Sequence, residues 1–308
     1  MPCIYDEIVR AEINEIEEEQ MSQETKELYE KYARGAMGRR EFLERLAALA
    51  GGTAAAAALL PALEGGGNAA SITQLVPKDD PRLETGHIKY PTESGEMRAY
   101  QARPKNGTKL PGVIVIHENR GLNPHTEDVA RRVALEGFIA VAPDALTPVG
   151  GTPENPDDAR ALFQKLDHDA NTRNFVAAVA YLKTHPQATG KVGCMGFCWG
   201  GGVTNQVAVH SPDLAAAVPF YGMQPAPEDV PKIKAAMLIH YAGDDERINA
   251  GIPPFEEALK KAGIEYTIHM YEGAGHAFLN DTGTRYNKEA AELAWKRTIA
   301  FFKEKLKP

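Results

Sequence analysis

The 308-residue sequence has few cysteines and no strongly basic segment. Its three cysteines, Cys3, Cys194 and Cys198, are too few for a disulfide framework. An extended chain would place Cys194 and Cys198 about 13 Å apart, which is beyond disulfide reach. The net charge is -8, and no cluster of lysine and arginine marks a nucleic-acid-binding surface. We therefore expect free thiols and no nucleic-acid partner.

Motifs for metals and cofactors are also missing. No spacing of histidine, cysteine and aspartate is typical of a metal site. The glycine-rich stretch at 196–201 lacks the glycine spacing and the following acid of a dinucleotide-binding loop, and no phosphate-binding loop is present. His117, His240 and His269 lie within or at the ends of apolar segments, which is more typical of buried core histidines than of ligands. The sequence therefore predicts no cofactor and no metal.

Residues 1–36 differ from the rest of the chain because they are strongly acidic. The first thirty residues contain ten acidic and two basic side chains. Apolar residues recur at helical spacing among them, which favours an amphipathic helix. This segment is either a solvated helix or disordered arm, or a docking helix through which the chain could form a homo-oligomer.

Residues 37–70 contain a paired arginine, Arg39 and Arg40, followed by a stretch rich in alanine and glycine. The stretch ends in small residues that could form a cleavage site near Ala69 or Ala70. The arrangement resembles a twin-arginine signal, which predicts transfer by the export machinery to the periplasm. The acidic residues before the arginines depart from such signals. The alternative is an alanine-rich helix of a folded protein that stays in the cytoplasm.

Residues 71–85 are expected to be a linker, and residues 86–308 a single α/β domain of normal size. Strand-like and helix-like segments alternate in this region, which predicts a mostly parallel sheet with helices around it. The expected strands are GHIKYP, EMRAYQARP, GVIVIHE, FIAVAPD, KVGCMGF, LAAAVPFYG, AAMLIHYAG and EYTIHMYEG. Helices are expected over 125–136, 157–166, 170–184, the segment GGVTNQVAVH, 253–262 and the C-terminal segment 285–306.

The motif GFCWGG at residues 196–201 joins an expected strand to an expected helix and contains Cys198. A strand that ends in Gly-x-Cys-x-Gly-Gly and enters a helix is the cysteine form of a nucleophile elbow. The helix N-terminus would favour the thiolate form of this cysteine. A glycine-rich turn around an inert cysteine is the alternative.

Two later loops supply an acid and a histidine. Asp244 and Asp245 follow the strand AAMLIHYAG, and His276 lies in a glycine-flanked loop after the strand EYTIHMYEG. The order nucleophile, acid, histidine, with each residue in a loop after a strand, is that of α/β-hydrolases. The carboxyl ends of parallel strands meet at one edge of the sheet, so we expect the three groups to converge there.

Residues 86–306 resemble the dienelactone hydrolase family, through GFCWGG, through GAGHAF around His276 and through Glu118 in IHENRGLN. The resemblance implies an α/β-hydrolase fold, with a mostly parallel central sheet and helices on both faces. It also favours Asp245 over Asp244, because the acid of the family is followed by two residues and then an aliphatic one, as in DERI.

The resemblance implies acyl transfer to a cysteine. Cys198 would attack an ester or lactone carbonyl to give a thioester, with Asp245 orienting His276 as the proton carrier. The N–H groups of Trp199 and Asn119 would bind the oxyanion. Glu118 would contact the resting thiol and take part in its activation.

The substrate is less well defined by the sequence. Dienelactone hydrolases of the chlorocatechol pathway bind a substrate carboxylate through arginines, one of them four residues after the catalytic histidine, where this chain has Asn280. Arg120 and Arg160 are candidates to replace it in substrate binding. The sequence thus predicts a carboxymethylenebutenolidase-like hydrolase of small esters or lactones. A broad-specificity carboxylesterase that does not act on dienelactone, or a non-catalytic binding or scaffold protein of the same fold, are the alternatives.

Overall fold

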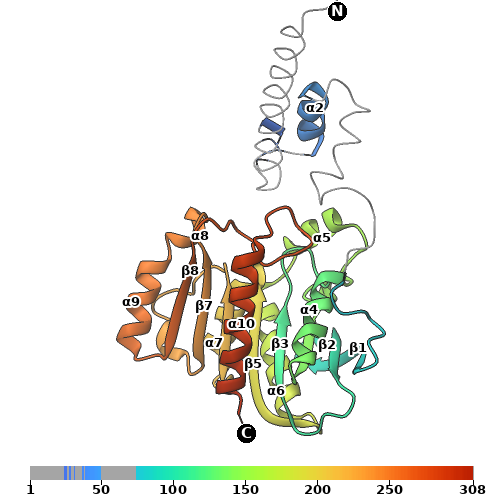
Figure 1. Ribbon diagram of the computed structural model, residues 1–308, viewed down its shortest axis with the longest axis vertical. Helices are drawn as coiled ribbons and strands as arrows, with labels where there is room; N and C mark the ends of the chain where they lie inside the picture. Colours follow the sequence, from blue (N-terminus) through green and yellow to red (C-terminus); the bar gives the residue numbers. More distant parts are fainter. Residues whose placement is uncertain are drawn as a thin grey trace, which may run out of the picture. The chain divides into compact units, whose positions relative to one another are not determined.

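The computed structural model describes residues 24, 25, 28, 31, 37, 39–49 and 74–307 (Figure 1). The chain divides into two compact units, residues 1–71 and residues 72–308. None of the described helices is long and apolar enough to cross a bilayer.

The first unit contains helix α2 (Arg39–Leu49), which begins at the paired arginine. Phe42 and Leu46 lie one turn apart on this helix, and both are fully buried in a small cluster with Leu28. The cleavage site predicted near Ala70 lies outside the described residues, as does most of the acidic segment 1–36. The export signal and the docking helix therefore stay predictions.

The second unit is built on one eight-stranded sheet, in the strand order β1-β2-β4-β3-β5-β6-β7-β8. Strand β2 runs antiparallel to its neighbours β1 and β4, and the pairs from β4 to β8 are parallel. All eight strands expected from the sequence are present. Their bounds are β1 (Leu83–Thr92), β2 (Gly95–Pro104), β3 (Leu110–Ile116), β4 (Ile139–Pro143), β5 (Ala188–Phe197), β6 (Ala216–Phe220), β7 (Ala236–Ala242) and β8 (Tyr266–Tyr271).

Helices cover both faces of the sheet. Helices α4 and α10 pack on one face, and α6, α7 and α9 pack on the other (Figure 1). The mostly parallel α/β architecture predicted from the sequence is confirmed. The helices are α4 (Pro124–Leu135), α5 (Pro156–Phe163), α6 (His168–Thr184), α7 (Trp199–His210), α8 (Glu246–Asn249), α9 (Ile252–Ala262) and α10 (Lys288–Lys305), with short 3-10 turns η1 (Thr147–Val149) and η2 (Val230–Lys232).

The last helix starts later than the sequence suggested. Residues 285–306 were expected to be helical, but α10 begins at Lys288. Asn287 is its N-cap, and the side chain of this residue accepts a hydrogen bond from the N–H of Ala290 at 3.1 Å. An asparagine at the N-cap satisfies a backbone donor that the first helical turn leaves free.

The central strands bury side chains on both faces, as their continuous apolar sequences indicate. On β3, Ile114 and Ile116 face the layer of α6 and α7, whereas Val113 and Val115 face the layer of α4 and α10. This alternation is the two-residue period of a strand. A parallel sheet covered on both faces therefore needs no polar residues along β3.

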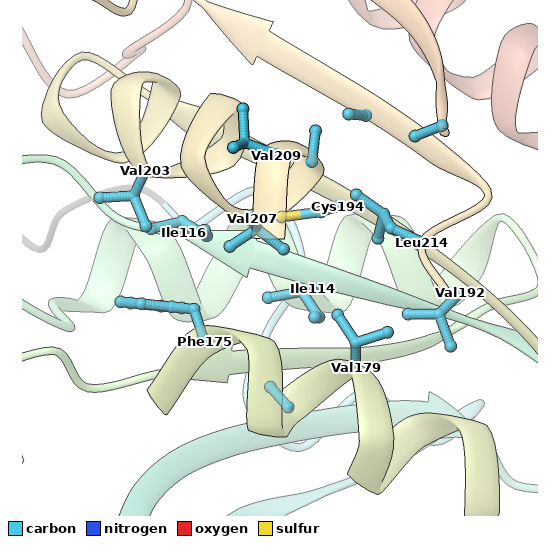
Figure 2. Close-up of a cluster of buried hydrophobic side chains, with 14 of the residues drawn as sticks. Ile114, Ile116, Phe175, Val179, Val192, Cys194, Val203, Val207, Val209 and Leu214 are labelled. Atoms are coloured by element: carbon cyan, nitrogen blue, oxygen red, sulfur yellow. The ribbon is translucent and has the colours of Figure 1, made fainter. Parts of the chain in front are cut away.

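Cys194 belongs to this apolar core. Its sulfur lies among aliphatic side chains that include Ile114 and Val207 (Figure 2). The residue is fully buried, and burial raises the pKa of its thiol to about 12. Both described cysteines are free, as expected. Cys194 is a packing residue whose thiol is not reactive.

A buried polar cluster holds residues 74–76 on helix α4. Asp128 accepts hydrogen bonds from the N–H groups of Leu75, at 3.2 Å, and Val76, at 2.8 Å. Arg131 is fully buried, and it donates to the Val76 carbonyl at 2.7 Å and to the Gln74 side chain at 2.9 Å. A buried guanidinium is tolerated only when such partners surround it. We call these five residues the α4 clamp.

Because of the α4 clamp, the folded domain begins earlier in the chain than residue 86, where the sequence analysis placed its start. Residues 71–85 were predicted to be a linker, yet residues 74–76 are bound to α4 and strand β1 already begins at Leu83. The contacts of residues 74–76 with α4 are to residues more than 50 positions away, so the sequence around residues 74–76 gave no sign of them.

Candidate active site

Four of the predicted site residues lie in loops that follow parallel strands. Glu118 follows β3, Cys198 follows β5, Asp245 follows β7 and His276 follows β8. Because these strands run parallel, their carboxyl ends share one edge of the sheet. The fold therefore brings together residues that are up to 158 positions apart in the sequence, from Glu118 to His276.

The turn between β5 and α7 holds Cys198 in a strained conformation. Its φ is 56° and its ψ is -114°, a region that residues with a side chain rarely adopt. A Cβ atom on Gly196 would lie 2.2 Å from the Gly200 carbonyl oxygen, and one on Gly200 would lie 2.4 Å from the His117 carbonyl oxygen. Both glycines are thus required by the close approach of the backbone. The turn thus has the strained backbone and the close glycine contacts that the sequence motif predicts.

Cys198 lies at the N-terminus of a helix and next to backbone donors. Helix α7 starts at Trp199, so its N-terminal dipole is directed at Cys198. Within the described chain, the N–H groups of Trp199 and Asn119 have no hydrogen-bond partner. Unpartnered donors at a helix N-terminus and in a neighbouring turn can bind an oxyanion.

His276 and Asp245 form the expected pair. Nδ1 of His276 lies 2.5 Å from Oδ2 of Asp245, and both side chains are largely buried. Burial by itself would lower the pKa of His276, but hydrogen bonds to Asp245 and Cys198 and their negative charges raise it to about 9. His276 therefore carries a proton at neutral pH, beside the sulfur of Cys198.

The structure separates the two candidate acids. Asp245 is 8% exposed and contacts His276, whereas Asp244 is exposed to solvent. The N–H of Asp244 donates to the Ala274 carbonyl at 3.1 Å, a contact of its backbone and not of its carboxylate. Only Asp245 is placed to orient the imidazole.

Glu118 is held by a residue whose role the sequence did not indicate. Oε2 of Glu118 accepts a hydrogen bond of 3.0 Å from Nδ2 of Asn280. The oxygen of the Asn280 amide accepts from the N–H of Thr282, at 3.0 Å, and from its hydroxyl, at 2.6 Å. These contacts fix the amide so that its NH₂ group faces Glu118. The other carboxylate oxygen, Oε1, is buried without a hydrogen-bond partner within the described chain.

The two candidate substrate-binding arginines lie on different elements. Arg120 lies in the turn after β3, and Arg160 lies on α5. Each interacts with another group, so neither is a free cation. Among the described residues, neither forms a hydrogen bond or ion pair with Glu118, Cys198 or His276.

Tyr221 is a site residue that the sequence analysis missed. It follows β6, has a φ of 37°, and its ring centroid lies 5.1 Å from that of His276. Burial, and then the negative charges of Glu118 and Cys198, raise the pKa of its hydroxyl well above the usual value. The phenol stays neutral and forms a wall of the site. An aromatic residue directly after the strand next to the elbow was the available sequence signal.

The core assignment of His240 is confirmed, because this side chain is fully buried and bonded to Thr298 and Tyr271. His269 is half-buried and stacks on His240 with ring centroids 5.8 Å apart. Over residues 39–49 and 74–307, and at the few isolated positions described before them, no three metal-binding side chains gather at one point.

Comparison with known proteins gives a consistent result. Residues 97–306 match the dienelactone hydrolase family. A protein of Saccharolobus solfataricus named "Putative carboxymethylenebutenolidase" is 35% identical over 254 residues, which cover 70% of this chain and 97% of that protein. "Protein usf" of Aquifex pyrophilus is 37% identical over 233 residues, covering 71% and 98% of the two chains.

Solved structures are similar as well. A crystal structure titled "Putative Dienelactone Hydrolase" from Klebsiella pneumoniae aligns with a TM-score of 0.66 and 29% identity, over 72% of this chain and 99% of that one. A dienelactone hydrolase from Anabaena variabilis aligns with a TM-score of 0.58 over 73% of this chain and 100% of that one. At 20% identity, the second likeness supports the fold alone.

Proposed function

The chain belongs to the dienelactone hydrolase family and is an ester hydrolase of α/β-hydrolase fold, and on this premise we propose that it cleaves small esters or lactones through a thioester on Cys198. The observation that carries the proposal is the strained elbow. A φ of 56° at Cys198 is costly, and it places the sulfur at the start of α7 and beside the His276–Asp245 pair. A cysteine with only a packing role needs no such conformation.

In the first step, the Cys198 thiolate attacks the carbonyl carbon of the substrate. The negative charge that develops on the carbonyl oxygen is met by the N–H groups of Trp199 and Asn119. The carbon–oxygen ester bond then breaks, and protonated His276 gives its proton to the leaving alcohol oxygen. The products of this step are the alcohol, a thioester on Cys198 and neutral His276.

Hydrolysis of the thioester completes the cycle. In the thioester the sulfur carries no charge, so one of the groups that raises the pKa of His276 is lost. The imidazole can then accept a proton from a water that attacks the acyl carbon. When the carbon–sulfur bond breaks, the carboxylic acid leaves and the pair of thiolate and imidazolium is restored. Glu118, whose Oε1 is buried and unpartnered within the described chain, is assigned the contact to Cys198 in the form in which the sulfur carries the proton.

The site favours a substrate without a carboxylate. Relatives carry the name carboxymethylenebutenolidase, and that reaction involves a lactone with a free carboxylate. Here Asn280 stands where the family has an arginine, and its amide is already bonded to Glu118 and Thr282. Arg120 and Arg160 interact with other groups. We therefore assign neutral small esters and lactones as the substrate class.

The thioester can be tested directly. Mixing the full chain with p-nitrophenyl acetate and quenching in acid within the first turnover should trap one acetyl group. Chymotryptic cleavage after Phe197 separates the two cysteines, and mass analysis should find the acetyl group on the peptide that contains Cys198 and not on the one that contains Cys194. Release of nitrophenolate with no acetyl group on Cys198 would contradict the proposed mechanism.

The substrate class is tested by a matched pair of esters. We expect kcat/KM for ethyl butyrate to exceed that for monoethyl succinate by about 10-fold, because Asn280 stands at the position of the arginine and Glu118 repels a second carboxylate. The two acyl chains have the same length, so they differ mainly in charge. A preference for the succinate monoester would show that an arginine of this chain recognises the carboxylate after all.

A further inference from the structure

We propose that His117 is a positioning residue for the oxyanion site, whose ring fixes the Glu118–Asn119 peptide so that the Asn119 N–H faces the carbonyl oxygen of a substrate under attack by Cys198. The inference rests on the proposed function. The sequence analysis assigned His117 to the core, and the ring is indeed fully buried. In addition to its packing contacts, the ring forms two hydrogen bonds with the backbone.

Both ring nitrogens of His117 have defined roles. Nε2 lies 3.2 Å from the backbone nitrogen of Ala145, and a backbone N–H can only donate. Nε2 is therefore the acceptor and carries no proton. Nδ1 lies 2.6 Å from the Glu118 carbonyl oxygen, which can only accept, so Nδ1 carries the proton and donates it. The two partners select one neutral tautomer.

An anchored carbonyl determines the direction of the next N–H. The C=O of Glu118 and the N–H of Asn119 belong to one planar trans peptide unit, so they point in opposite directions. Since the His117 ring binds the carbonyl, the N–H is directed away from that ring. The N–H has no hydrogen-bond partner among the described residues, as expected of a donor kept for the substrate.

The same ring contacts the residue that supplies the other donor. The His117 and Trp199 rings stack with centroids 5.6 Å apart and an interplanar angle of 14°. The backbone of His117 also lies so close to α7 that Gly200 cannot carry a Cβ. One buried histidine therefore links the two backbone segments that would bind the oxyanion.

The turn after β3 needs such a hold because its peptide could otherwise rotate. Its far side is fixed where the N–H of Leu122 donates to the Thr152 hydroxyl at 2.9 Å, and that hydroxyl donates to Asp144 at 2.6 Å. His117 provides the hold on the near side. If the Glu118–Asn119 peptide rotated by half a turn, it would present a carbonyl oxygen to the developing negative charge in place of a donor.

Three substitutions separate the contributions of the ring. His117→Phe keeps an aromatic ring against Trp199 but removes both polar contacts. His117→Gln places its amide near the Nε2 position and loses the donor at Nδ1. His117→Asn places an NH₂ group near the Nδ1 position and can still donate to the Glu118 carbonyl. Urea unfolding of each variant reports whether the domain is folded.

We expect His117→Phe and His117→Gln to lower kcat for p-nitrophenyl acetate by about 10- to 100-fold with little change in KM, and His117→Asn to recover most of the loss. The rate at which iodoacetamide alkylates Cys198 should remain close to that of wild type in all three. Alkylation needs the thiolate but forms no oxyanion, so it separates the donor from the nucleophile.

Two results would overturn the inference: normal ester hydrolysis in His117→Gln, or an equal fall of hydrolysis and alkylation in the variants that fold. If His117→Phe does not fold, the comparison of His117→Gln with His117→Asn decides the question. Ester cleavage by the wild-type protein is measured before any variant is assayed. If wild type cleaves no ester, the proposed function is refuted, and this result is distinct from a failure of the inference about His117.

Discussion

Replacement of Cys198 by alanine is expected to lower kcat/KM for p-nitrophenyl acetate by about 10⁴-fold or more, because the proposed thioester cannot form without the sulfur. The residual rate would come from binding and the oxyanion donors alone. The measurement compares the steady-state rates of ester cleavage by the Cys198→Ala protein and by wild type at equal protein concentration. A Cys198→Ala protein that still cleaves the ester at the wild-type rate would remove the nucleophile from the mechanism.

Cys194 provides the matched control. It lies in the same strand-turn region, but its sulfur is in the apolar core (Figure 2) and its thiol pKa is raised to about 12. Cys194→Ala should retain kcat, at a cost in unfolding free energy of about 1 kcal/mol from lost packing. In a Cys3→Ala background, iodoacetamide should modify one thiol of the native protein and two after unfolding. Native modification of Cys194 would contradict this assignment.

The second large effect is expected at Asp245. Asp245→Asn should lower kcat/KM by about 10³- to 10⁴-fold, because the neutral amide neither fixes the same imidazole tautomer nor stabilises the imidazolium. Asp244→Asn is the paired control, since it makes the same chemical change at the adjacent exposed carboxylate. Activity of Asp244→Asn should remain near that of wild type. The reverse result would assign the acid to Asp244.

The Asp245→Asn substitution should also change the pKa of His276 and the dependence of protein stability on pH. Asp245 is among the groups that raise the pKa of His276 to about 9, so its loss should shift the His276 titration to lower pH. Ring-proton NMR measures this shift. A raised histidine pKa stabilises the folded state below pH 6.5, and the contribution disappears as the pH rises through about 9. The stability difference between wild type and Asp245→Asn should therefore be largest in acid and small above pH 9.

Much of the fold was predictable because its signals are local. The apolar segments predicted the eight strands. The order of nucleophile, acid and histidine predicted the edge of the sheet at which these three residues meet. The elbow was predictable for the same reason. Gly196 and Gly200 lie within two residues of Cys198, so the spacing alone states which positions cannot carry a side chain.

The contacts that were not predicted join distant parts of the chain. Asn280 binds Glu118 across 162 residues, so the sequence showed only that an arginine was missing and not what the asparagine does. His117 resembled any core histidine, because its role depends on the orientation of one peptide unit. Hydrophobic periodicity contains no information about either contact.

The α4 clamp has a consequence for how much of this protein forms an independent folding unit. The match to the family begins at residue 97, inside the first hairpin. A fragment cut there would lose β1 and two of the partners of the buried Arg131 guanidinium, Val76 and Gln74, and would keep only Tyr100 and Asp128. Hydrogen bonds to a charged group are each worth about 1.5–3 kcal/mol, so the loss of two of them is a large part of the total stability of a domain. The segment that identifies the ancestry of this chain is therefore shorter than the segment that can fold.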